Sequence, residues 1–545
     1  MFIDFRQFPT DEVIAADLCI IGAGAAGITV AQALAGSGLD ICLFETGGLE
    51  PELQRARLAR SDQQSGDYNT ALCRLRYFGG STNHWGGYNV PLDEIDFARR
   101  DWVDHSGWPI DRAALEPWYQ EANKLLGAGA FEYTRAELQA ADWPYPDLDL
   151  QLLDDIYWRL SPQPTEFATG YRDTFRQAAN VRVFLYATVT ELHADPGART
   201  VTAATVRDIE GNRARIKAAR FVIAAGALES ARLLLASADV SPNGLGNDSG
   251  NIGRYFMMHP HIDIGAAFNI QSEVARLFST YRSNGIEIVP GIGPSVASQR
   301  EHRILNSSVM LQRLPNPDSG YAAMLKLRDE LKRLYFGWKI GVDDLEAEVD
   351  IKALAWTALT DIDSVVAGLW QRSRDDAYVG DSAGNAANIY VQSEQAPNPD
   401  SRITLRPDRD ALDMPQMKVE CRVLPIDKQT LRVMGELIGR ELGMRNGGRV
   451  QLVDWLLDPD VNWDSEIWGG CHHMGTTRMS ASPADGVVNT DCRVHGLDNT
   501  YIASSSVFTT SGHANPTITI VALALRLAEH LRATAAPVTV SKAPG

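Results

Sequence analysis

The chain has 545 residues, of which 45% are hydrophobic and 22% are charged, and its formal net charge is −18. This composition is that of an ordinary globular protein with enough residues for more than one domain. The negative charge argues against nucleic acid as a partner, because its phosphates would be repelled.

Neither end of the chain resembles a targeting or membrane segment. Residues 1–13 lack the basic and apolar regions of a signal peptide. The apolar stretch 518–531 contains Arg526 and is too short to span a bilayer. We therefore expect a cytoplasmic protein without a membrane span. Export in complex with a signal-bearing partner and assembly into a homo-oligomer both stay open.

The six cysteines lie far apart and include no CxxC pair. Cys19 and Cys42 fall inside apolar runs typical of strands, where a free thiol behaves as a small hydrophobic side chain. This pattern favours a reducing compartment over a disulfide framework.

Residues 14–45 have the pattern of a nucleotide-binding strand–helix–strand unit. Gly22, Gly24 and Gly27 satisfy GxGxxG. The first glycine permits a tight turn, the second lets the backbone approach a pyrophosphate, and the third allows close helix–strand packing. Glu45 ends the second strand, 21 residues after Gly24, where a carboxylate can meet ribose hydroxyls. A single fingerprint at the N-terminus, with no second one, favours FAD over NAD.

Further along the chain, strands and helices alternate. Residues 181–195 alternate in polarity and are rich in β-branched side chains, which predicts strands. Residues 221–237 predict a strand, a turn at Gly226 and a helix, as in a second nucleotide-side unit. The interval 262–465 mixes strands such as 387–394 with helical insertions, and we assign it to a domain that faces the substrate.

The amphipathic stretch 324–336 allows four interpretations. It could be a lid, a subunit contact, a membrane-surface helix or a plain surface helix, and we favour the last.

Asn515–Pro516 predicts the start of a helix, with Asn515 as its cap and Pro516 at the first helical position. The composition of the following helix predicts burial, and its N-terminus offers unpaired N–H groups and a positive dipole end. Pointed at the pyrimidine end of a flavin, this end would stabilise the negative charge that collects there on reduction. The alternative is that Asn515 only caps its helix.

His472 and His473 stand side by side in "WGGCHHMGTTRM". Histidine changes its charge near neutral pH, which makes the pair a candidate for acid–base chemistry. Metal ligation and plain packing are the alternatives. A metal site would need Cys471, His472, His259 and His261 to converge, and adjacent ligands without a spaced partner pattern argue against it. We therefore predict no metal.

The order and spacing of seven segments along the chain indicate a family resemblance. They are "GAGAAG" with Glu45, "RYFGGSTNHWGG" (76–87), "AAGALESARLLL" (224–235), "NIGRYFMMHP" (251–260), "EQAPNPDSRITL" (394–405), "CHHMGTTRM" (471–479) and "SGHANPT" (511–517). Together they resemble the glucose–methanol–choline (GMC) oxidoreductase family over nearly the whole chain. The chain is most similar to the pyranose oxidase and C-glycoside oxidase branch, with bacterial sugar and gluconate dehydrogenase flavoprotein subunits close behind.

The resemblance implies an α/β fold (α+β overall). A Rossmann-like FAD-binding domain is expected from separated segments, together with a substrate domain built on a mostly antiparallel sheet with helices. We place the FAD-binding domain at residues 1–100, 180–261 and 466–535. We place the substrate-binding domain at residues 101–179 and 262–465, followed by a flexible tail at 536–545.

The resemblance also implies one FAD and oxidation of an alcohol by hydride transfer to flavin N5. His472 matches the histidine that family members place over N5, and Asn515 matches the second residue there. A histidine can accept the hydroxyl proton, while Asn515 would stabilise the developing alkoxide. His473 and His513 are predicted to contact the substrate.

His84 matches the histidine that pyranose oxidases join covalently to the flavin. We predict that His84 contacts the flavin, and we leave the covalent link open without favouring it. The predicted cofactor contacts are Gly22, Gly24, Ala26, Gly27, Glu45, Gly79, Ser81, Asn83, His84, Trp85, Gly86, Val189, Ala225, Ser505, Asn515, Pro516 and Thr517.

One segment departs from the family pattern. Many relatives carry Gly-Ser-Ser and then Phe-Pro where this chain has Ala503 to Ser506 and Phe508-Thr509. Without that glycine and proline, the loop at the flavin can follow a different path.

The leading functional hypothesis is FAD-dependent oxidation of an alcohol group of a sugar, glycoside or polyol, with oxygen or another acceptor reoxidising FAD. A second is a sugar or alcohol dehydrogenase that passes electrons to a quinone or a cytochrome partner. A third is a lyase that keeps FAD only structurally. A flavin-containing binding protein without turnover is disfavoured by the pair His472 and Asn515.

Overall fold

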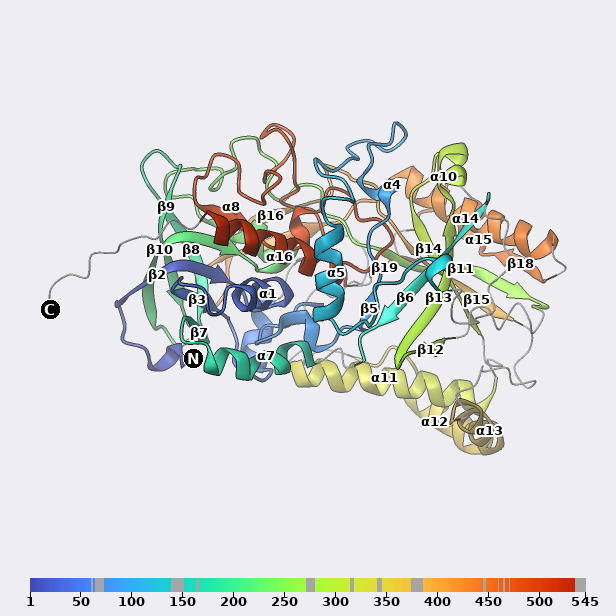
Figure 1. Ribbon diagram of the computed structural model, residues 1–545. Helices are drawn as coiled ribbons and strands as arrows, with labels where there is room; N and C mark the ends of the chain where they lie inside the picture. The colour runs from blue at the N-terminus through green and yellow to red at the C-terminus, as the bar shows by residue number, and fades with distance from the viewer. Residues whose placement is uncertain are drawn as a thin grey trace, which may run out of the picture.

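The computed structural model describes residues 1–59, 62–63, 73–138, 151–162, 166–270, 280–313, 318–340, 346–373, 386–444, 447–458, 460–463, 466–469 and 471–534. Two large sheets lie toward opposite sides of the molecule in Figure 1. The tail predicted at 536–545 lies outside the described residues. Within these ranges, no helix combines the length and the hydropathy needed to cross a membrane.

The first sheet joins strands from both ends of the chain. In the described ranges its order is β1 (Phe2–Asp4), β7 (Val181–Leu185), β3 (Ile41–Phe44), β2 (Val13–Ile21), β10 (Arg213–Ile223), β9 (Val201–Arg207) and β8 (Thr188–Ala194), and β20 (Thr500–Ile502) pairs with β10. The pairs from β1 to β10 are parallel, and β10, β9 and β8 pair antiparallel. The expected Rossmann-like sheet is confirmed.

The βαβ unit predicted near the N-terminus consists of β2, α1 (Ala25–Ala33) and β3. All of β3 is buried, as a central parallel strand requires, and its register sets Cys42 beside Cys19 of β2. The strand and helix predicted at 221–237 are β10 and α8 (Gly226–Ala236). Helix α16 (Thr517–Ala533) packs against α1 and against α5 (Glu116–Leu125).

The second sheet is antiparallel, as expected. In the described ranges its order is β18 (Arg449–Leu452), β11 (Pro260–Phe268), β15 (Ala387–Ser393), β14 (Ser307–Arg313), β13 (Ile286–Pro294), β6 (Leu153–Leu160) and β5 (Tyr88–Asn89), with β12 (Tyr281–Ser283) on β13 and β19 (Trp468–Gly469) on β11. Helix α14 (Pro425–Met444) covers it, because Leu431 and Met434 share a core with Ile264 and Val391. The domain boundaries given above stay a prediction.

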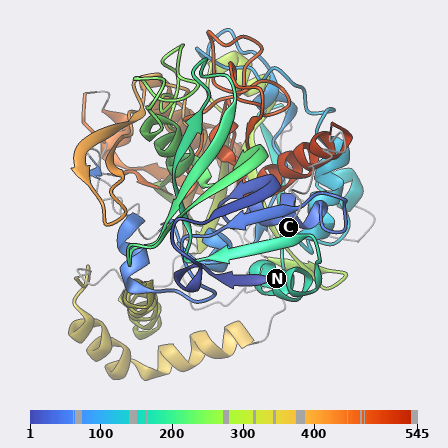
Figure 2. The same ribbon diagram turned by 90° about the vertical axis from the view of Figure 1, so that its left-hand side faces the viewer.

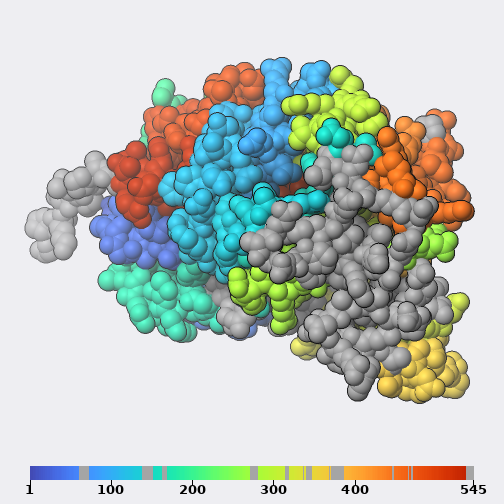
Figure 3. All heavy atoms as spheres, turned by 45° about the vertical axis from the view of Figure 1, so that its right-hand side comes forward, coloured from blue at the N-terminus to red at the C-terminus, as the bar shows by residue number. Residues whose placement is uncertain are grey.

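A group of three helices projects from the body of the molecule (Figures 2 and 3). It consists of α11 (Gly320–Ile340), α12 (Ile351–Thr360) and α13 (Ile362–Ser373), which pack on one another. The amphipathic stretch 324–336 lies within α11, so its helical structure is confirmed, and its role stays a prediction.

The remaining elements are short or peripheral. A small sheet contains β16 (Arg402–Arg409), β17 (Pro415–Glu420) and β4 (Asp62–Gln63). The other helices are α2 (Leu53–Ala56), α4 (Glu94–Phe97), α6 (Arg135–Leu138), α7 (Glu166–Gln177), α10 (Val296–His302) and α15 (Asp454–Leu457), with 3₁₀ turns η1 (Phe5–Gln7), η2 (Arg57–Ala59), η3 (Gly80–Asn83) and η6 (Ser505–Val507).

Candidate active site

A cavity of 460 Å³ lies at the carboxyl ends of β2, β3 and β10. This is the edge of a parallel sheet at which ligands bind in open α/β folds. Sixteen of the predicted site residues line it: Gly22, Gly24, Ala26, Glu45, Ser81, His84, Trp85, Gly86, Val189, Ala225, His472, His473, Ser505, Asn515, Pro516 and Thr517. The cavity therefore brings together residues from both ends of the chain.

The turn after β2 fits a phosphate group. Gly22 has a φ of +104°, and a Cβ atom there would lie 2.6 Å from the carbonyl oxygen of Ala224. A Cβ atom on Gly27 would lie 1.9 Å from the carbonyl oxygen of Gly22. By contrast, a Cβ atom on Gly24 would have no protein atom within 4 Å. The backbone at the start of α1 is thus open to the cavity, as diphosphate binding at a helix N-terminus requires.

Glu45 is fixed beside this turn. Its carboxylate accepts hydrogen bonds from the backbone N–H groups of Ala23, at 3.0 Å, and Gly47, at 3.1 Å. Burial raises the pKa of Glu45, and these two N–H groups oppose the rise. The side chain lines the cavity and stands where the sequence placed a ribose contact.

Residues 79–86 form a second wall. The N–H group of Gly79 donates to the carbonyl oxygen of Ala23 at 2.8 Å, which joins this segment to the glycine turn. The side-chain amide of Asn83 donates to the carbonyl oxygens of Phe78 and Gly80, so it stabilises η3 from outside the cavity lining. Burial lowers the pKa of His84 to about 4, and its imidazole lines the cavity in the neutral form.

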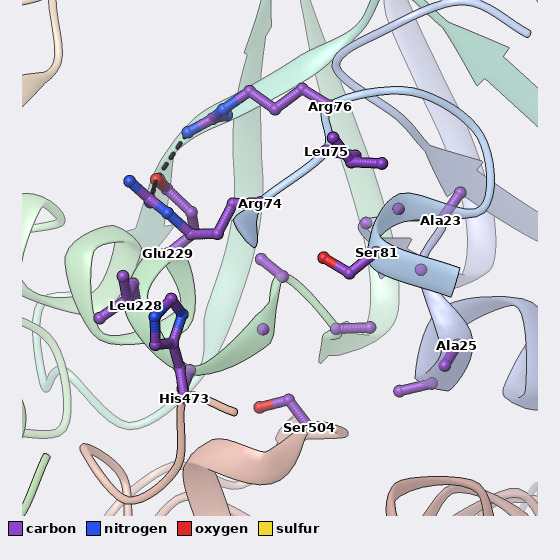
Figure 4. Close-up of a pocket in the computed structure, with 18 of the residues that line it drawn as sticks. Ala23, Ala25, Arg74, Leu75, Arg76, Ser81, Leu228, Glu229, His473 and Ser504 are labelled. Carbon is purple, nitrogen blue, oxygen red and sulfur yellow. Dashed lines mark hydrogen bonds and ion pairs between the residues drawn. The ribbon is translucent and has the colours of Figure 1, made fainter. Parts of the chain in front are cut away.

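A cluster of charged side chains lies on the wall formed by α8 (Figure 4). The guanidinium groups of Arg74 and Arg76 both contact Oε1 of Glu229, at 2.7 and 2.6 Å. Arg232 contacts the other oxygen of Glu229 at 3.3 Å and Asp410 at 2.7 Å. This network fixes the segment that follows Cys73 to α8.

The structure corrects the expectation drawn from the cysteines. Cys73 and Cys471, separated by 398 residues, form a disulfide, whereas the other four cysteines are buried outside any disulfide. No local spacing could have indicated this pair. The bond joins the segment that carries Arg74 to the residue before His472.

His472 lies against the second sheet. Its Nδ1 is 2.9 Å from Nδ1 of His259, and Nε2 of His259 is 3.2 Å from the carbonyl oxygen of Ser511. A carbonyl oxygen can only accept a hydrogen bond, so Nε2 of His259 carries the proton and its Nδ1 accepts one from His472. Nε2 of His472 is therefore left with a lone pair.

Asn515 faces that lone pair. Its Nδ2 is 3.4 Å from Nε2 of His472, and its Oδ1 lies 3.4 Å from Nε2 of Gln392. Gln392 also donates to the carbonyl oxygen of His513 at 2.5 Å. The amide of Gln392 thus sets the orientation of Asn515, with the NH₂ group toward His472.

The predicted capping role of Asn515 is wrong. Helix α16 begins at Thr517, Pro516 occupies the N-cap position, and no side chain caps the helix. The side chain of Asn515 is directed instead toward His472 and Gln392.

His472, His259 and His473 have lowered pKa values and are neutral at pH 7. Burial, followed by the neighbouring His259 and His261, lowers the pKa of His472 well below 6.5. Burial likewise lowers the pKa of His259 and of His473 to about 3. A neutral His472 can accept a proton at physiological pH.

His261 completes a cluster of three histidines. It lies on β11, and its Nδ1 contacts the hydroxyl of Tyr390 on β15. Ring nitrogens of His259, His261 and His472 all lie within 4.8 Å of one another. Three of the four residues required by the metal alternative thus converge, while Cys471 is held by Cys73.

Two predicted substrate residues have different positions. His473 lines the cavity, and its carbonyl oxygen accepts a hydrogen bond from Ser505 at 2.6 Å. His513 lies outside the lining, where its Nε2 is 3.1 Å from a carboxylate oxygen of Asp93. Gly27, Gly79 and Asn83 also lie outside the lining, where they pack or support it.

Sequence reasoning missed Gln392 and Tyr390. The sequence did contain a signal for them. Residues two apart on a strand point to the same face, which applies to Tyr390 and Gln392 and equally to His259 and His261 in "HPH". The register of β11 and β15, which sets His261 opposite Gln392, could not be read from the sequence.

Comparison with known proteins agrees with this architecture. Residues 17–245 match the model for FAD dependent oxidoreductases, and residues 397–524 match that for GMC oxidoreductases. The chain therefore contains an FAD oxidoreductase domain and a GMC oxidoreductase C-terminal domain. It is an FAD-dependent enzyme of a class that acts on CH–OH donors as oxidases or dehydrogenases.

Several relatives align with nearly the whole chain. The large subunit of fructose dehydrogenase from Gluconobacter japonicus is 22% identical over 95% of this chain and 98% of its own. Paromamine 6'-oxidase from Streptomyces fradiae is 25% identical over 94% of this chain and 90% of its own. The crystal structure of pyridoxine 4-oxidase from Mesorbium loti shares the fold, with a TM-score of 0.53, 17% identity, and coverage of 95% of this chain and 100% of its own.

Proposed function

We propose that this enzyme oxidises an alcohol group of a sugar, glycoside or polyol to the carbonyl, with His472 as the base and Asn515 as a hydrogen-bond donor to the reacting oxygen. The observation that carries the proposal is the pair formed by Nε2 of His472 and Nδ2 of Asn515, 3.4 Å apart. Both residues line the cavity that contains the glycine turn.

The cavity residues would hold FAD by three kinds of contact. The open backbone at Gly24 would receive the diphosphate at the N-terminus of α1. The carboxylate of Glu45 would accept hydrogen bonds from ribose hydroxyls. His84 and Trp85 would contact the isoalloxazine ring near His472. A covalent bond from His84 stays open.

When bound, FAD supplies a hydride acceptor. The rest of the chemistry belongs to side chains of this protein. A substrate oxygen placed between the two groups donates its proton to Nε2 of His472 and accepts a hydrogen bond from Nδ2 of Asn515. The imidazolium formed at His472 still donates from Nδ1 to His259. His472 is partly exposed in the cavity, and the hydrogen bond from Asn515 strengthens as negative charge develops on the oxygen.

Two relatives support this substrate class. One is named as a fructose dehydrogenase and the other as a paromamine 6'-oxidase, and both align with almost the whole chain. The name of the first, a large subunit, favours a second candidate: a dehydrogenase that passes electrons to a partner subunit or a quinone in place of oxygen.

Anaerobic mixing of the FAD-loaded protein with sugars, glycosides and aromatic alcohols tests the proposal. We expect a sugar-type substrate to bleach the flavin. His472→Ala should slow bleaching by about 10²–10⁴-fold while FAD stays bound. Asn515→Ala should slow it by a smaller factor of about 10². His302→Ala, at the end of α10, is the matched control. Normal reduction in His472→Ala would remove this residue from the base role.

Reoxidation separates the two candidate acceptors. The reduced protein is mixed with oxygen or with a quinone, and the rate at which flavin colour returns is followed. Fast recovery with oxygen identifies an oxidase, and recovery with the quinone alone identifies a dehydrogenase.

A further inference from the structure

Three imidazoles meet behind the cavity wall in a geometry that suits a metal ion. Ring nitrogens of His259, His261 and His472 all lie within 4.8 Å of one another. The ring of His472 has its centre 5.1 Å from that of His259 and 5.4 Å from that of His261. Zinc binds imidazole nitrogen at about 2.0–2.1 Å, so rings that share one tetrahedral ion have centres roughly 5 Å apart. The observed spacing therefore needs little adjustment to admit an ion.

Each imidazole also has a polar group beside its second nitrogen. Nε2 of His259 faces the carbonyl oxygen of Ser511 at 3.2 Å, and Nδ1 of His261 contacts the hydroxyl of Tyr390. Histidines that ligate metals donate from the second nitrogen to an acceptor, and the acceptor fixes the ring and its tautomer. Nε2 of His472 faces the NH₂ group of Asn515 at 3.4 Å, so a metal-bound His472 would donate to Asn515 only after this amide has turned its oxygen toward Nε2.

The donor set selects the kind of ion. Three neutral imidazoles without a carboxylate suit Zn²⁺, Co²⁺ or Cu²⁺ and not Mg²⁺ or Ca²⁺, which prefer oxygen. Among the described residues, one other group has ligand atoms equally close, and it consists of Glu191, His193 and Asp239. Both nitrogens of His193 already bond, to Asp239 at 2.9 Å and to Thr205 at 2.7 Å. Asp239 is exposed, so this group is the weaker candidate and a useful control.

We propose that His259, His261 and His472 form a binding site for one Zn²⁺-type cation, and that its occupation turns the enzyme off. The proton that His472 shares with His259 lies between their two Nδ1 atoms. An ion bound there needs both lone pairs, so this proton moves to Nε2 of His472. Nε2 then donates and can no longer accept the substrate proton. No proton is released, because all three rings start and end neutral.

Binding of the ion does not depend on the proposed function, whereas its inhibitory effect rests on it. Metal-free, FAD-loaded protein is prepared with a chelator and titrated with Co²⁺ and with Zn²⁺. Co²⁺ should give the visible bands of a tetrahedral ion, at longer wavelengths than oxidised flavin. Equilibrium dialysis should find one Zn²⁺ per chain at this site, and the bound ion should abolish anaerobic bleaching by substrate.

Matched variants locate the ion. His261→Gln should lose the Co²⁺ bands and the Zn²⁺ equivalent, whereas His193→Gln should keep both. Tyr390→Phe retains all three imidazoles and should weaken Zn²⁺ binding by about 10–100-fold, the effect of removing an outer partner. Flavin content and melting temperature show whether each variant is folded, and Tyr390→Phe remains informative if His261→Gln does not fold.

The outcomes separate the two proposals. Absence of Co²⁺ bands, or their loss only in His193→Gln, overturns the three-histidine site and leaves the role of His472 in oxidation intact. Zn²⁺ bound through His261 with unchanged bleaching upholds the site and overturns both the inhibition and the assignment of His472 as base.

Discussion

Nε2 of Gln392 lies 3.4 Å from Oδ1 of Asn515 and 2.5 Å from the carbonyl oxygen of His513. Gln392 lies on β15 of the second sheet, whereas Asn515 precedes α16, which packs on α1 of the nucleotide-binding βαβ unit. Gln392, from the antiparallel sheet, thus orients the side-chain amide of Asn515, which lies on the FAD-binding side of the molecule. This contact explains how residues from two layers form the proposed catalytic pair, His472 and Asn515.

Gln392→Leu should therefore slow substrate oxidation without removing FAD. The variant loses hydrogen bonds of about 0.5–1.5 kcal/mol each, and Asn515 is free to turn its oxygen toward His472. We expect kcat to fall by about 10-fold, measured as the anaerobic rate of flavin reduction. The kcat of Gln392→Glu should fall at least as far, because its carboxylate would repel the two oxygens that the Gln392 amide contacts, Oδ1 of Asn515 and the carbonyl oxygen of His513. Gln416→Ala on β17 is the control, and an unchanged rate in both Gln392 variants would contradict the orienting role.

His259 should affect the rate of substrate oxidation by fixing which ring nitrogen of His472 carries the proton. His259→Leu removes the acceptor of the Nδ1 proton, so Nε2 no longer holds the lone pair by default. We expect the rate of flavin reduction to fall by about 10–100-fold. His259→Asn offers a carbonyl oxygen as a replacement acceptor and should recover part of the loss. A merely structural role predicts equal defects in the two variants, together with a lower melting temperature.

The sequence predicted the nucleotide side well because its signals are local. The glycine turn depends on steric limits at Gly22 and Gly27, and these limits are set by neighbours within one βαβ unit and its adjoining strand. Alternating, β-branched residues likewise located β7 and β8, and the strand–turn–helix pattern at 221–237 located α8 and the end of β10. The family resemblance then placed His472 and Asn515 at one site, and the structure brings them together.

The support of the site was not predictable, since it depends on long-range register. His261 meets Gln392 only because β11 and β15 pair antiparallel in one register. Cys73 meets Cys471 across 398 residues, with no spacing rule to indicate it. The alternative that Asn515 caps its helix was wrong, because local propensity cannot show that Gln392 and His472 take its side chain.

Gly24 provides a test of cofactor position that is separate from folding. Its φ is −85°, and a Cβ atom there meets no protein atom within 4 Å, so Gly24→Ala should fold normally. The added methyl group faces the cavity, where it should weaken FAD binding. We expect an unchanged melting temperature for the apoprotein and a raised Kd for FAD, measured by flavin fluorescence.

Gly27 gives the contrasting result. A Cβ atom on Gly27 would lie 1.9 Å from the carbonyl oxygen of Gly22, so Gly27→Ala should disturb the turn itself and destabilise the apoprotein. FAD binding as tight in Gly24→Ala as in the wild type would place the diphosphate elsewhere.

The ionised carboxylate of Glu229 should make the stability of the folded protein fall at acid pH. Its burial alone would raise its pKa, but Arg76, Arg232 and Arg74 outweigh that effect and lower the pKa from 4.5 to about 2. A carboxyl with a depressed pKa stabilises the folded state above its unfolded pKa, and this contribution is lost as the pH falls through the folded value. The window therefore runs from about pH 4.5 down to about pH 2. A shift of this size corresponds to a contribution on the order of 3 kcal/mol.

Glu229→Gln should accordingly have a lower melting temperature than the wild type at pH 6. This gap in melting temperature should narrow as the pH falls below 4.5. The neutral amide leaves three guanidinium groups facing one another, of which Arg232 keeps its ion pair with Asp410. Differential scanning calorimetry of both proteins across this range measures the gap. Glu210→Gln, an exposed carboxyl with a distant contact to Arg55, should show almost no gap at any pH. A gap of constant size between pH 6 and pH 3 would mean that packing of the glutamate, and not its charge, stabilises the wall.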